Sequence, residues 1–179
     1  GFTGSGVNVA VYESGPDVTT NLSVTDRYTT SPSTSSHSRH THGIIKNVQA
    51  NAPHGHAPDC NLHSANSMDL DAIRWAAQDR GCTVISQSFH RESEQTTATP
   101  SFDDVYKDWL ALRWPYPTIC EAAGNGADDE FVNHKGYNRL TVANHNDTGS
   151  AMSSDTVFRN PSTSHGDREL PEIAANGMG

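Results

Sequence analysis

Three histidines lie close together in the chain, at His37, His40 and His42. Imidazole is the side chain whose unperturbed pKa lies nearest neutral pH, and it is also a common zinc ligand. Two zinc-binding histidines on one helix are usually four residues apart, whereas the second and third of these histidines follow His37 by three and five residues. The spacing therefore disfavours a zinc site, although a His-rich metal-binding domain remains an alternative.

A histidine that transfers protons works best beside a carboxylate that orients its ring and stabilises its protonated form. Glu13 is the candidate, because it directly follows the strand-like run 7–12 and precedes a Ser-Gly-Pro turn sequence. Asp17 is a second candidate, although an aspartate after a proline is more often a turn residue or a helix cap. Asn125 follows another apolar run and lies between two glycines, so on its own it fits a turn residue.

Short apolar runs alternate with helical patterns, and this alternation must bring the candidate residues together. Strands are predicted at 7–12, 61–65, 83–86, 117–123 and 140–143, helices at 42–50, 69–80 and 102–112, and a polar surface loop at 19–36. The pattern predicts an α/β, doubly wound three-layer fold with a mainly parallel central sheet. Reactive groups in such sheets collect at the carboxyl ends of the strands, and Glu13, Ser88 and Asn125 all follow strands.

Composition narrows the function classes further. The 179 residues suit one domain, and the net charge of −9 with three lysines disfavours nucleic acid or an anionic membrane surface as partner. No apolar run approaches the length of a membrane span, the first residues show no signal-peptide pattern, and the acidic composition leads us to expect a secreted or extracytoplasmic protein. The odd number of cysteines, Cys60, Cys82 and Cys120, leaves at least one thiol without a partner in the chain, with the pairing open.

Four segments, in order, resemble motifs of the subtilisin-like serine peptidases. They are residues 37–43 (HSRHTHG), 55–62 (GHAPDCNL), 84–88 (VISQS) and 122–125 (AAGN). The first is similar to the family's His-Gly-Thr-His-Val-Ala-Gly, keeping its two histidines and its glycine in position. The last is identical to the family's Ala-Ala-Gly-Asn. The resemblance implies a serine endopeptidase that hydrolyses polypeptides by acyl transfer.

The resemblance also assigns expected roles to single residues. It implies that His37 is the general base, that Glu13 orients it where the family has aspartate, and that Asn125 donates to the oxyanion. The substrate-binding edge is expected at Ser88, Phe89, His90 and Gly124. Glu13 followed by Asp17 is also similar to the serine-carboxyl peptidases, but the intervening Gly-Pro disfavours their helix, and that family lacks a histidine base. Subtilisin-like peptidases often bind calcium, yet no aspartate-rich loop here matches such a site.

The family's nucleophile segment, Gly-Thr-Ser-x-Ala-x-Pro, has no counterpart in this sequence. Ser153 and Ser154, and the serines in 162–164, lack both the glycine and a following helix pattern. We therefore expect residues 1–179 to be the larger fragment of a catalytic domain, incomplete at its C-terminus. A second chain or a cleaved C-terminal fragment is expected to supply the serine. The alternative is a catalytically inactive relative used for binding or processing.

Overall fold

The computed structural model describes residues 2–52, 54–125, 131–145 and 170–176. The chain divides into two compact units. The first unit comprises Gly1–Ser88 and Leu112–Thr118, and the second comprises Phe89–Ala111 and Ile119–Gly179. Each unit is described by itself below.

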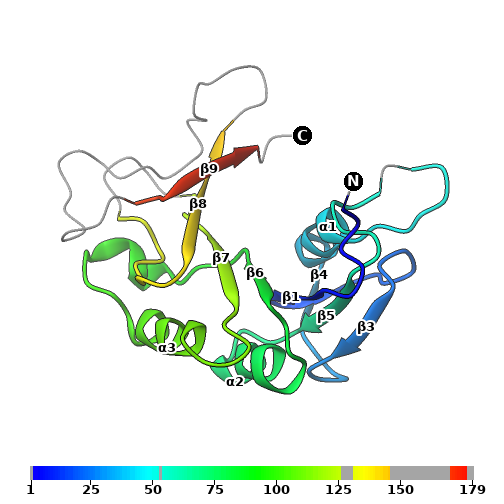
Figure 1. The fold of residues 1–179 in the computed structure, drawn as a ribbon. Helices are drawn as coiled ribbons and strands as arrows, with labels where there is room; N and C mark the ends of the chain where they lie inside the picture. Colours follow the sequence, from blue (N-terminus) through cyan, green and yellow to red (C-terminus); the bar gives the residue numbers. More distant parts are fainter. Residues whose placement is uncertain (1, 53, 126–130, 146–169, 177–179) are drawn as a thin grey trace. The chain divides into compact units, whose positions relative to one another are not determined.

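The first unit is built on four parallel strands in the order β3-β5-β1-β6 (Figure 1). They are β3 (Val24–Arg27), β5 (Asn61–Ala65), β1 (Asn8–Tyr12) and β6 (Val84–Gln87). In the register of β1 and β5, Val9 lies opposite Leu62 and Tyr12 opposite Ala65. A central strand of a parallel sheet is covered on both faces, which explains why β1 is an almost continuous apolar run.

Helices cover both faces of these strands (Figure 1). Side chains alternate along a strand, so Val9 and Val11 share one face of β1, where they cluster with Leu62 and with Ile45 of helix α1 (Ser36–Ile45). On the opposite face, the hydroxyl of Tyr12 donates to the Met68 carbonyl at 2.8 Å, just before helix α2 (Leu70–Arg74). This layering agrees with the α/β fold predicted from the sequence.

Two helices differ from their predicted bounds. The helix predicted at 42–50 begins earlier, at Ser36, because the Ser35 side chain accepts a hydrogen bond from the Ser38 amide and caps the helix. It ends at Ile45, where Lys46 adopts an extended backbone and its buried amine donates to the Cys60 carbonyl at 2.6 Å. The helix predicted at 69–80 is α2 followed by a π-helical turn, η1 (Trp75–Asp79).

The polar segment 19–36, predicted as a surface loop, contains two strands. β3 is an edge strand beside β5, and an edge strand can carry polar residues because only part of its surface is covered. β4 (Thr34–Ser35) pairs with β2 (Gly15–Pro16) in a short separate parallel ladder. The loop prediction was therefore wrong for β3 and β4, because polarity alone does not distinguish an edge strand from a loop.

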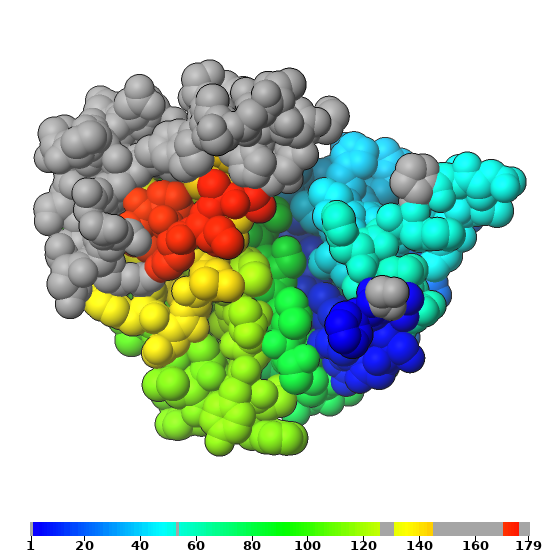
Figure 2. Space-filling model, turned by 45° about the horizontal axis from the view of Figure 1, so that its top comes forward, coloured from blue at the N-terminus to red at the C-terminus, as the bar shows by residue number. Residues whose placement is uncertain are grey.

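The second unit contains three parallel strands in the order β7-β8-β9. They are β7 (Thr118–Ala122), β8 (Leu140–His145) and β9 (Ile173–Asn176), and the short helix η2 (Glu92–Thr96) and helix α3 (Phe102–Ala111) precede them. Ala123, Val132, Ala143 and Leu170 form the apolar cluster beside these strands. In the space-filling view, residues of β9 lie at the surface next to those of β8 (Figure 2).

Two further sequence expectations bear on the described residues. All three cysteines are free thiols. No helix in the described ranges is long and apolar enough to cross a membrane. The serines of 153–154 and 162–164, considered above as nucleophiles, lie outside the described residues.

Candidate active site

The position of Glu13 follows from the alternation of side chains in β1. Val9 and Val11 face helix α1, and Glu13, two residues further on, continues the same face just beyond the end of the strand. Its side chain is 3% exposed. The alternation of side chains in β1 thus places a buried carboxylate on the face of the sheet that α1 covers.

Helix α1 presents two side chains to this carboxylate. His37 lies in the first turn, and Thr41 lies four residues later on the same face of the helix. The Nδ1 atom of His37 lies 2.9 Å from Oε1 of Glu13, and the Thr41 hydroxyl donates to Oε2 at 2.8 Å. Both carboxylate oxygens are therefore engaged by the same helix.

This geometry fixes which nitrogen of His37 is available for chemistry. A carboxylate oxygen accepts, so Nδ1 carries the proton, and in the neutral ring Nε2 keeps its lone pair. The His37 side chain is 61% exposed, whereas Glu13 is buried. An accessible acceptor nitrogen on a ring oriented by a buried carboxylate is the arrangement that general-base catalysis needs.

Hydrogen bonds between neighbouring segments fix the positions of Glu13 and His37 relative to each other. The Ser38 hydroxyl donates to the carbonyl of Ser14 at 2.5 Å, joining the helix to the residue after Glu13. The Gly15 amide donates to the Ser33 carbonyl at 2.8 Å, and Gly15 pairs with Thr34 in the β2–β4 ladder. A side chain at position 15 would approach Pro32 to 2.8 Å, so glycine permits this close packing. The segment after Glu13 is thereby fastened to the segment before His37.

The other candidate acid and the other histidines have different partners. Asp17 lies 3.5 Å from Arg39 rather than beside His37. His42 is buried, where Nδ1 donates to the Ser38 carbonyl at 2.7 Å and Nε2 lies 3.0 Å from the Ser64 hydroxyl. Burial lowers the pKa of His42 to about 4, so the ring is neutral at pH 7. Because both nitrogens of His42 are engaged within the protein, the geometry does not support a three-histidine metal site.

The predicted oxyanion donor lies in the second unit, just after β7. Asn125 is exposed, and Gly124 before it has a φ of +115°, which an L-residue rarely adopts. A Cβ atom at position 124 would lie 2.1 Å from Nδ2 of Asn133, so the close approach of this buried amide also requires glycine. The loop therefore presents the Asn125 side chain to solvent at the carboxyl end of a parallel strand.

The predicted substrate edge begins directly after β6. Ser88 ends the main segment of the first unit, whereas Phe89 and His90 begin the second, and all three are half-buried. The carbonyl of Phe89 accepts a hydrogen bond from Nε2 of His134 at 3.0 Å. One backbone acceptor of this edge is thus already engaged by a buried histidine, a contact that the sequence did not indicate.

None of the three cysteines is prepared for nucleophilic chemistry. Burial raises the pKa of the Cys82 thiol to about 12, and burial also raises the pKa of Cys60 and of Cys120. The thiolate is the reactive form of cysteine, so a raised pKa suppresses its reactivity at neutral pH. A cysteine–histidine mechanism therefore has no candidate nucleophile in this chain.

The second unit contains a buried network of charged side chains that sequence reasoning missed. Its members, each at most 6% exposed, are Glu94, Asp104, Lys107, Glu121, His134, Lys135 and Arg139. Arg139 contacts Asp104 at 2.6 Å and Glu121 at 2.5 Å, and Lys107 contacts Glu121 at 2.5 Å. The charges on helix α3 resemble a solvated helix face in sequence, so only packing identifies them as buried.

This network includes a group of three potential metal ligands, Glu94, Asp104 and His134. Calcium, which the family resemblance implies, takes six to eight oxygen ligands. Here Asp104 is already paired with Arg139, and the amine of Lys135 donates to the Glu94 carbonyl at 2.6 Å. Asp104 is thus committed to Arg139, and two carboxylates with one imidazole fall short of the oxygen ligands that calcium takes, so these residues do not fit such a site.

Comparison with known proteins gives matches at the level of structure. No protein-family model and no curated protein matches the sequence. The prenylagaramide maturation protease PagA superposes with a TM-score of 0.70 at 18% identity, covering 96% of this chain and 63% of its own. The psychrophilic subtilisin-like protease Apa1 from the Antarctic psychrotroph Pseudoalteromonas sp. AS-11 gives 0.66 at 17% identity, covering 85% and 39%. MycP1 from Mycobacterium smegmatis gives 0.61 at 18% identity, covering 88% and 56%.

The chain spans less than two thirds of the length of each of these structures. At identities of 17–18%, the likeness concerns the fold. It agrees with the parallel strands and flanking helices described above. The chain therefore has the subtilisin-like fold of Apa1 and its structural relatives.

Proposed function

We propose that this chain is the larger part of a subtilisin-like serine endopeptidase. The observation that carries the proposal is the 2.9 Å contact between Nδ1 of His37 and Oε1 of buried Glu13, in a chain with a subtilisin-like fold. The contact leaves Nε2 of an exposed imidazole available as a base. The proposed activity is hydrolysis of peptide bonds through an acyl-enzyme.

In the proposed mechanism, Nε2 of His37 removes the proton from a serine hydroxyl as its oxygen attacks the scissile carbonyl. Glu13 holds the ring in the required tautomer and stabilises the imidazolium that forms. Asn125 donates its side-chain amide to the oxygen that becomes negative, an interaction worth about 3–4 kcal/mol in the transition state. The imidazolium then protonates the leaving amine, and water repeats the sequence to release the acid.

Glutamate in place of aspartate is compatible with this role. Glu13 is one methylene longer than the family's aspartate, yet its carboxylate reaches Nδ1 at hydrogen-bond distance. Thr41 binds the second carboxylate oxygen and restricts the longer side chain. Glutamate serves as the triad acid on another hydrolase fold, so the chemistry does not depend on aspartate.

The substrate is proposed to pair as an added strand along Ser88, Phe89 and His90, and Gly124 is proposed as a further substrate-binding residue. Backbone pairing would give affinity, and His90 would alter the pocket that small residues form elsewhere in the family. The polypeptide substrate is thus the first partner. Localisation outside the cytoplasm is proposed from the acidic, lysine-poor composition.

The second proposed partner is the segment that carries the serine. We propose that a second chain or a cleaved C-terminal fragment supplies it, because no Gly-Thr-Ser motif occurs in residues 1–179. Measurement of intact masses under denaturing conditions in the purified, folded protein tests this. A second polypeptide beside the 19.3 kDa species supports the proposal, and the 19.3 kDa species alone in a folded monomer contradicts it.

A fluorophosphonate probe tests the activity itself, because it labels only an activated serine. Labelling of the serine-bearing segment, lost in His37→Ala and kept in the surface control Arg74→Gln, is the expected result. Absence of labelling between pH 5 and 10, with that segment shown to be present, would favour the alternative of a catalytically inactive binding or processing domain. That alternative is motivated by the substitution at Glu13 and the missing serine.

A further inference from the structure

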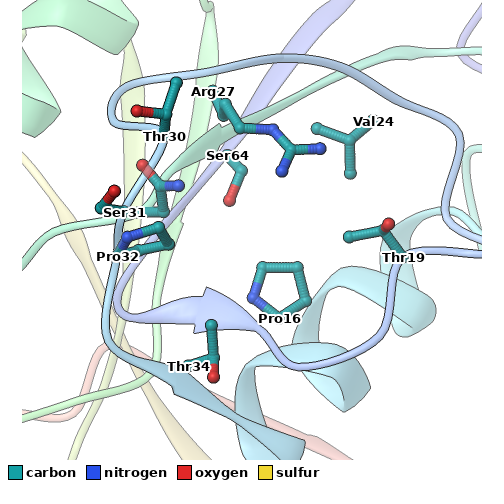
Figure 3. Close-up of a pocket in the computed structure, with 10 residues that line it drawn as sticks. Pro16, Thr19, Val24, Arg27, Thr30, Ser31, Pro32, Thr34 and Ser64 are labelled. Carbon is teal, nitrogen blue, oxygen red and sulfur yellow. The ribbon is translucent and has the colours of Figure 1, made fainter.

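A cavity of about 260 Å³ lies in the first unit, beside the ladder that holds the Glu13–His37 pair (Figure 3). Its walls come from β2, β3, β4, β5 and the loop between β3 and β4. Asn66 fixes this loop, because its side chain accepts from the Thr29 amide and donates to the Thr29 carbonyl, both at 2.8 Å. The cavity is therefore bounded by paired strands and by a loop anchored at its start.

A bulge in β3 determines which side chains face this cavity. The register of β3 against β5 shifts between Val24 and Asp26, so one extra residue enters the strand. In a regular strand, residues three apart lie on opposite faces, but an inserted residue brings them to the same face. Val24 and Arg27 accordingly both line the cavity, whereas Asp26 contacts Arg80 at 2.6 Å elsewhere.

Arg27 is the charged side chain of the cavity, and its guanidinium group points into it (Figure 3). In the described ranges, the Arg27 guanidinium has no ion pair or hydrogen bond, although the Arg27 amide donates to the Asp26 carboxylate, and no carboxylate lines the cavity. The other described arginines that have ion pairs, such as Arg39 and Arg80, contact aspartates. Arg27 is exposed, and its guanidinium has no counter-charge in the described ranges, so it is available to an external anion.

The remaining wall indicates what kind of anion fits. Pro16, Pro32 and Val24 offer apolar surface, and Thr19, Thr34 and Ser64 offer hydroxyl groups (Figure 3). The Ser64 hydroxyl donates to the neutral His42 ring, which leaves its lone pairs as acceptors for a ligand N–H. A single guanidinium with apolar walls suits a monoanion on a small body better than a phosphate, which usually has several donors.

We propose that this cavity binds a small carboxylate, with Arg27 forming a two-point contact to the carboxylate and the prolines covering a body about the size of one amino-acid residue. Pockets for drug-sized ligands hold roughly 300–1,000 Å³, so this cavity takes a smaller molecule. The same chemistry is offered by a free N-acylated amino acid and by the C-terminal residue of a peptide. The bound group would lie beside Thr34, three residues before His37 in the chain.

Titration of the ¹⁵N-labelled protein with N-acetylalanine, followed by amide chemical shifts, tests the proposal. Expected are shifts confined to residues 16–34 and 64–66, with Arg27→Gln weakening binding about tenfold or more through the lost charged hydrogen bonds. Arg27→Lys, which keeps the charge without the planar fork, is expected to bind more weakly than the wild type. Arg74→Gln removes an arginine outside the cavity, so it is expected to leave binding unchanged.

Three further ligands make the outcome decisive. N-acetylalaninamide lacks the carboxylate, so equal shifts from it would overturn the proposal, as would binding that survives Arg27→Gln. Inorganic phosphate binding more tightly than N-acetylalanine would replace the carboxylate with another anion class and overturn it too. Acetyl-trialanine with a free C-terminus distinguishes a peptide C-terminus from a free N-acylated amino acid as the ligand. Tighter binding than that of N-acetylalanine assigns the cavity to peptide ends, and weaker binding assigns it to free small acids.

Discussion

The two units each place a histidine beside carboxylates, but in opposite surroundings. In the first unit, His37 is 61% exposed and contacts buried Glu13 at 2.9 Å. In the second, His134 is 1% exposed, with Nδ1 3.9 Å from Glu94 and 3.7 Å from Glu121. Its Nε2 donates to the Phe89 carbonyl. The residue types are the same, and the access of the ring to solvent is different.

Access decides what each histidine can do. Burial lowers the pKa of His134, although the nearby carboxylates act in the opposite direction, and its Nε2 serves as a fixed donor to the Phe89 carbonyl. His37 has its acceptor nitrogen at the surface, where a substrate can reach it. A histidine near a carboxylate is therefore a candidate base only where the fold leaves one nitrogen open, and sequence spacing does not report this.

The largest expected difference between the units is in stability. Glu121→Gln should lower the free energy of unfolding by about 3–5 kcal/mol, because Lys107 and Arg139 lose a buried counter-charge. Glu13→Gln should cost about 1 kcal/mol, since the amide oxygen can still accept from His37. Urea denaturation of the two variants measures both values. Equal losses would contradict the expectation that the second unit depends more strongly on a buried counter-charge.

The two units should also lose stability in different pH ranges. The folded-state pKa of His42, about 4, lies below the ordinary 6.5. Between these two pH values His42 is protonated in the unfolded chain and neutral in the folded protein. Stability in the first unit should fall by about 3 kcal/mol as the pH decreases from 6.5 to 4. Hydrogen exchange of amides in β1 and β5 measures this, and His42→Gln should flatten the dependence.

The second unit should lose stability at lower pH than the first unit. Burial acts to raise the pKa of Asp104, but Arg139 and hydrogen bonds outweigh it and lower the pKa to about 2 from 3.8. Folding therefore favours the ionised form of Asp104. The ionised carboxylate contributes about 2 kcal/mol to the free energy of unfolding above pH 3.8, and this contribution is lost as the pH falls towards 2. Hydrogen exchange in β7 and β8 reports it. Loss already complete at pH 5 would disagree with the pairing of Asp104 and Arg139.

Two glycines with positive φ offer a matched test of the loop before Asn125. Gly124→Ala should destabilise by about 2–3 kcal/mol, because the new methyl group adds a clash with Asn133 to the cost of the backbone conformation. Gly6→Ala, at φ +79° with open space around it, should cost only about 1 kcal/mol. Thermal denaturation compares them. A similar cost for both would mean that Asn133 moves aside easily.

The smallest expected effect concerns the second hydrogen bond to Glu13. Thr41→Val keeps the shape of the side chain but removes the donor to Oε2, and should slow fluorophosphonate labelling about five- to tenfold, equivalent to about 1 kcal/mol. Thr20→Val, in the exposed loop before β3, is the control and should leave the rate unchanged. An unchanged rate in Thr41→Val would show that His37 alone positions the carboxylate.

Much of the fold was predictable because it depends on local patterns. The apolar runs at 7–12 and 61–65 and the helical spacing at 102–112 each identify an element that the structure contains. The start of α1 and the edge strand β3 were missed. A serine cap and a polar edge strand resemble loop residues until their hydrogen-bond partners are known.

Sequence alone determined that a carboxylate follows a strand at Glu13, that a histidine at His37 precedes a helical pattern, and that glycine precedes Asn125. These features are local, because strand alternation, helical spacing and the identity of adjacent residues involve only neighbouring positions in the chain. Only the tertiary structure decided that Glu13 rather than Asp17 meets His37, because the β2–β4 ladder turns the chain between them. It alone also decided which charges are buried, since burial depends on contacts between segments distant in sequence.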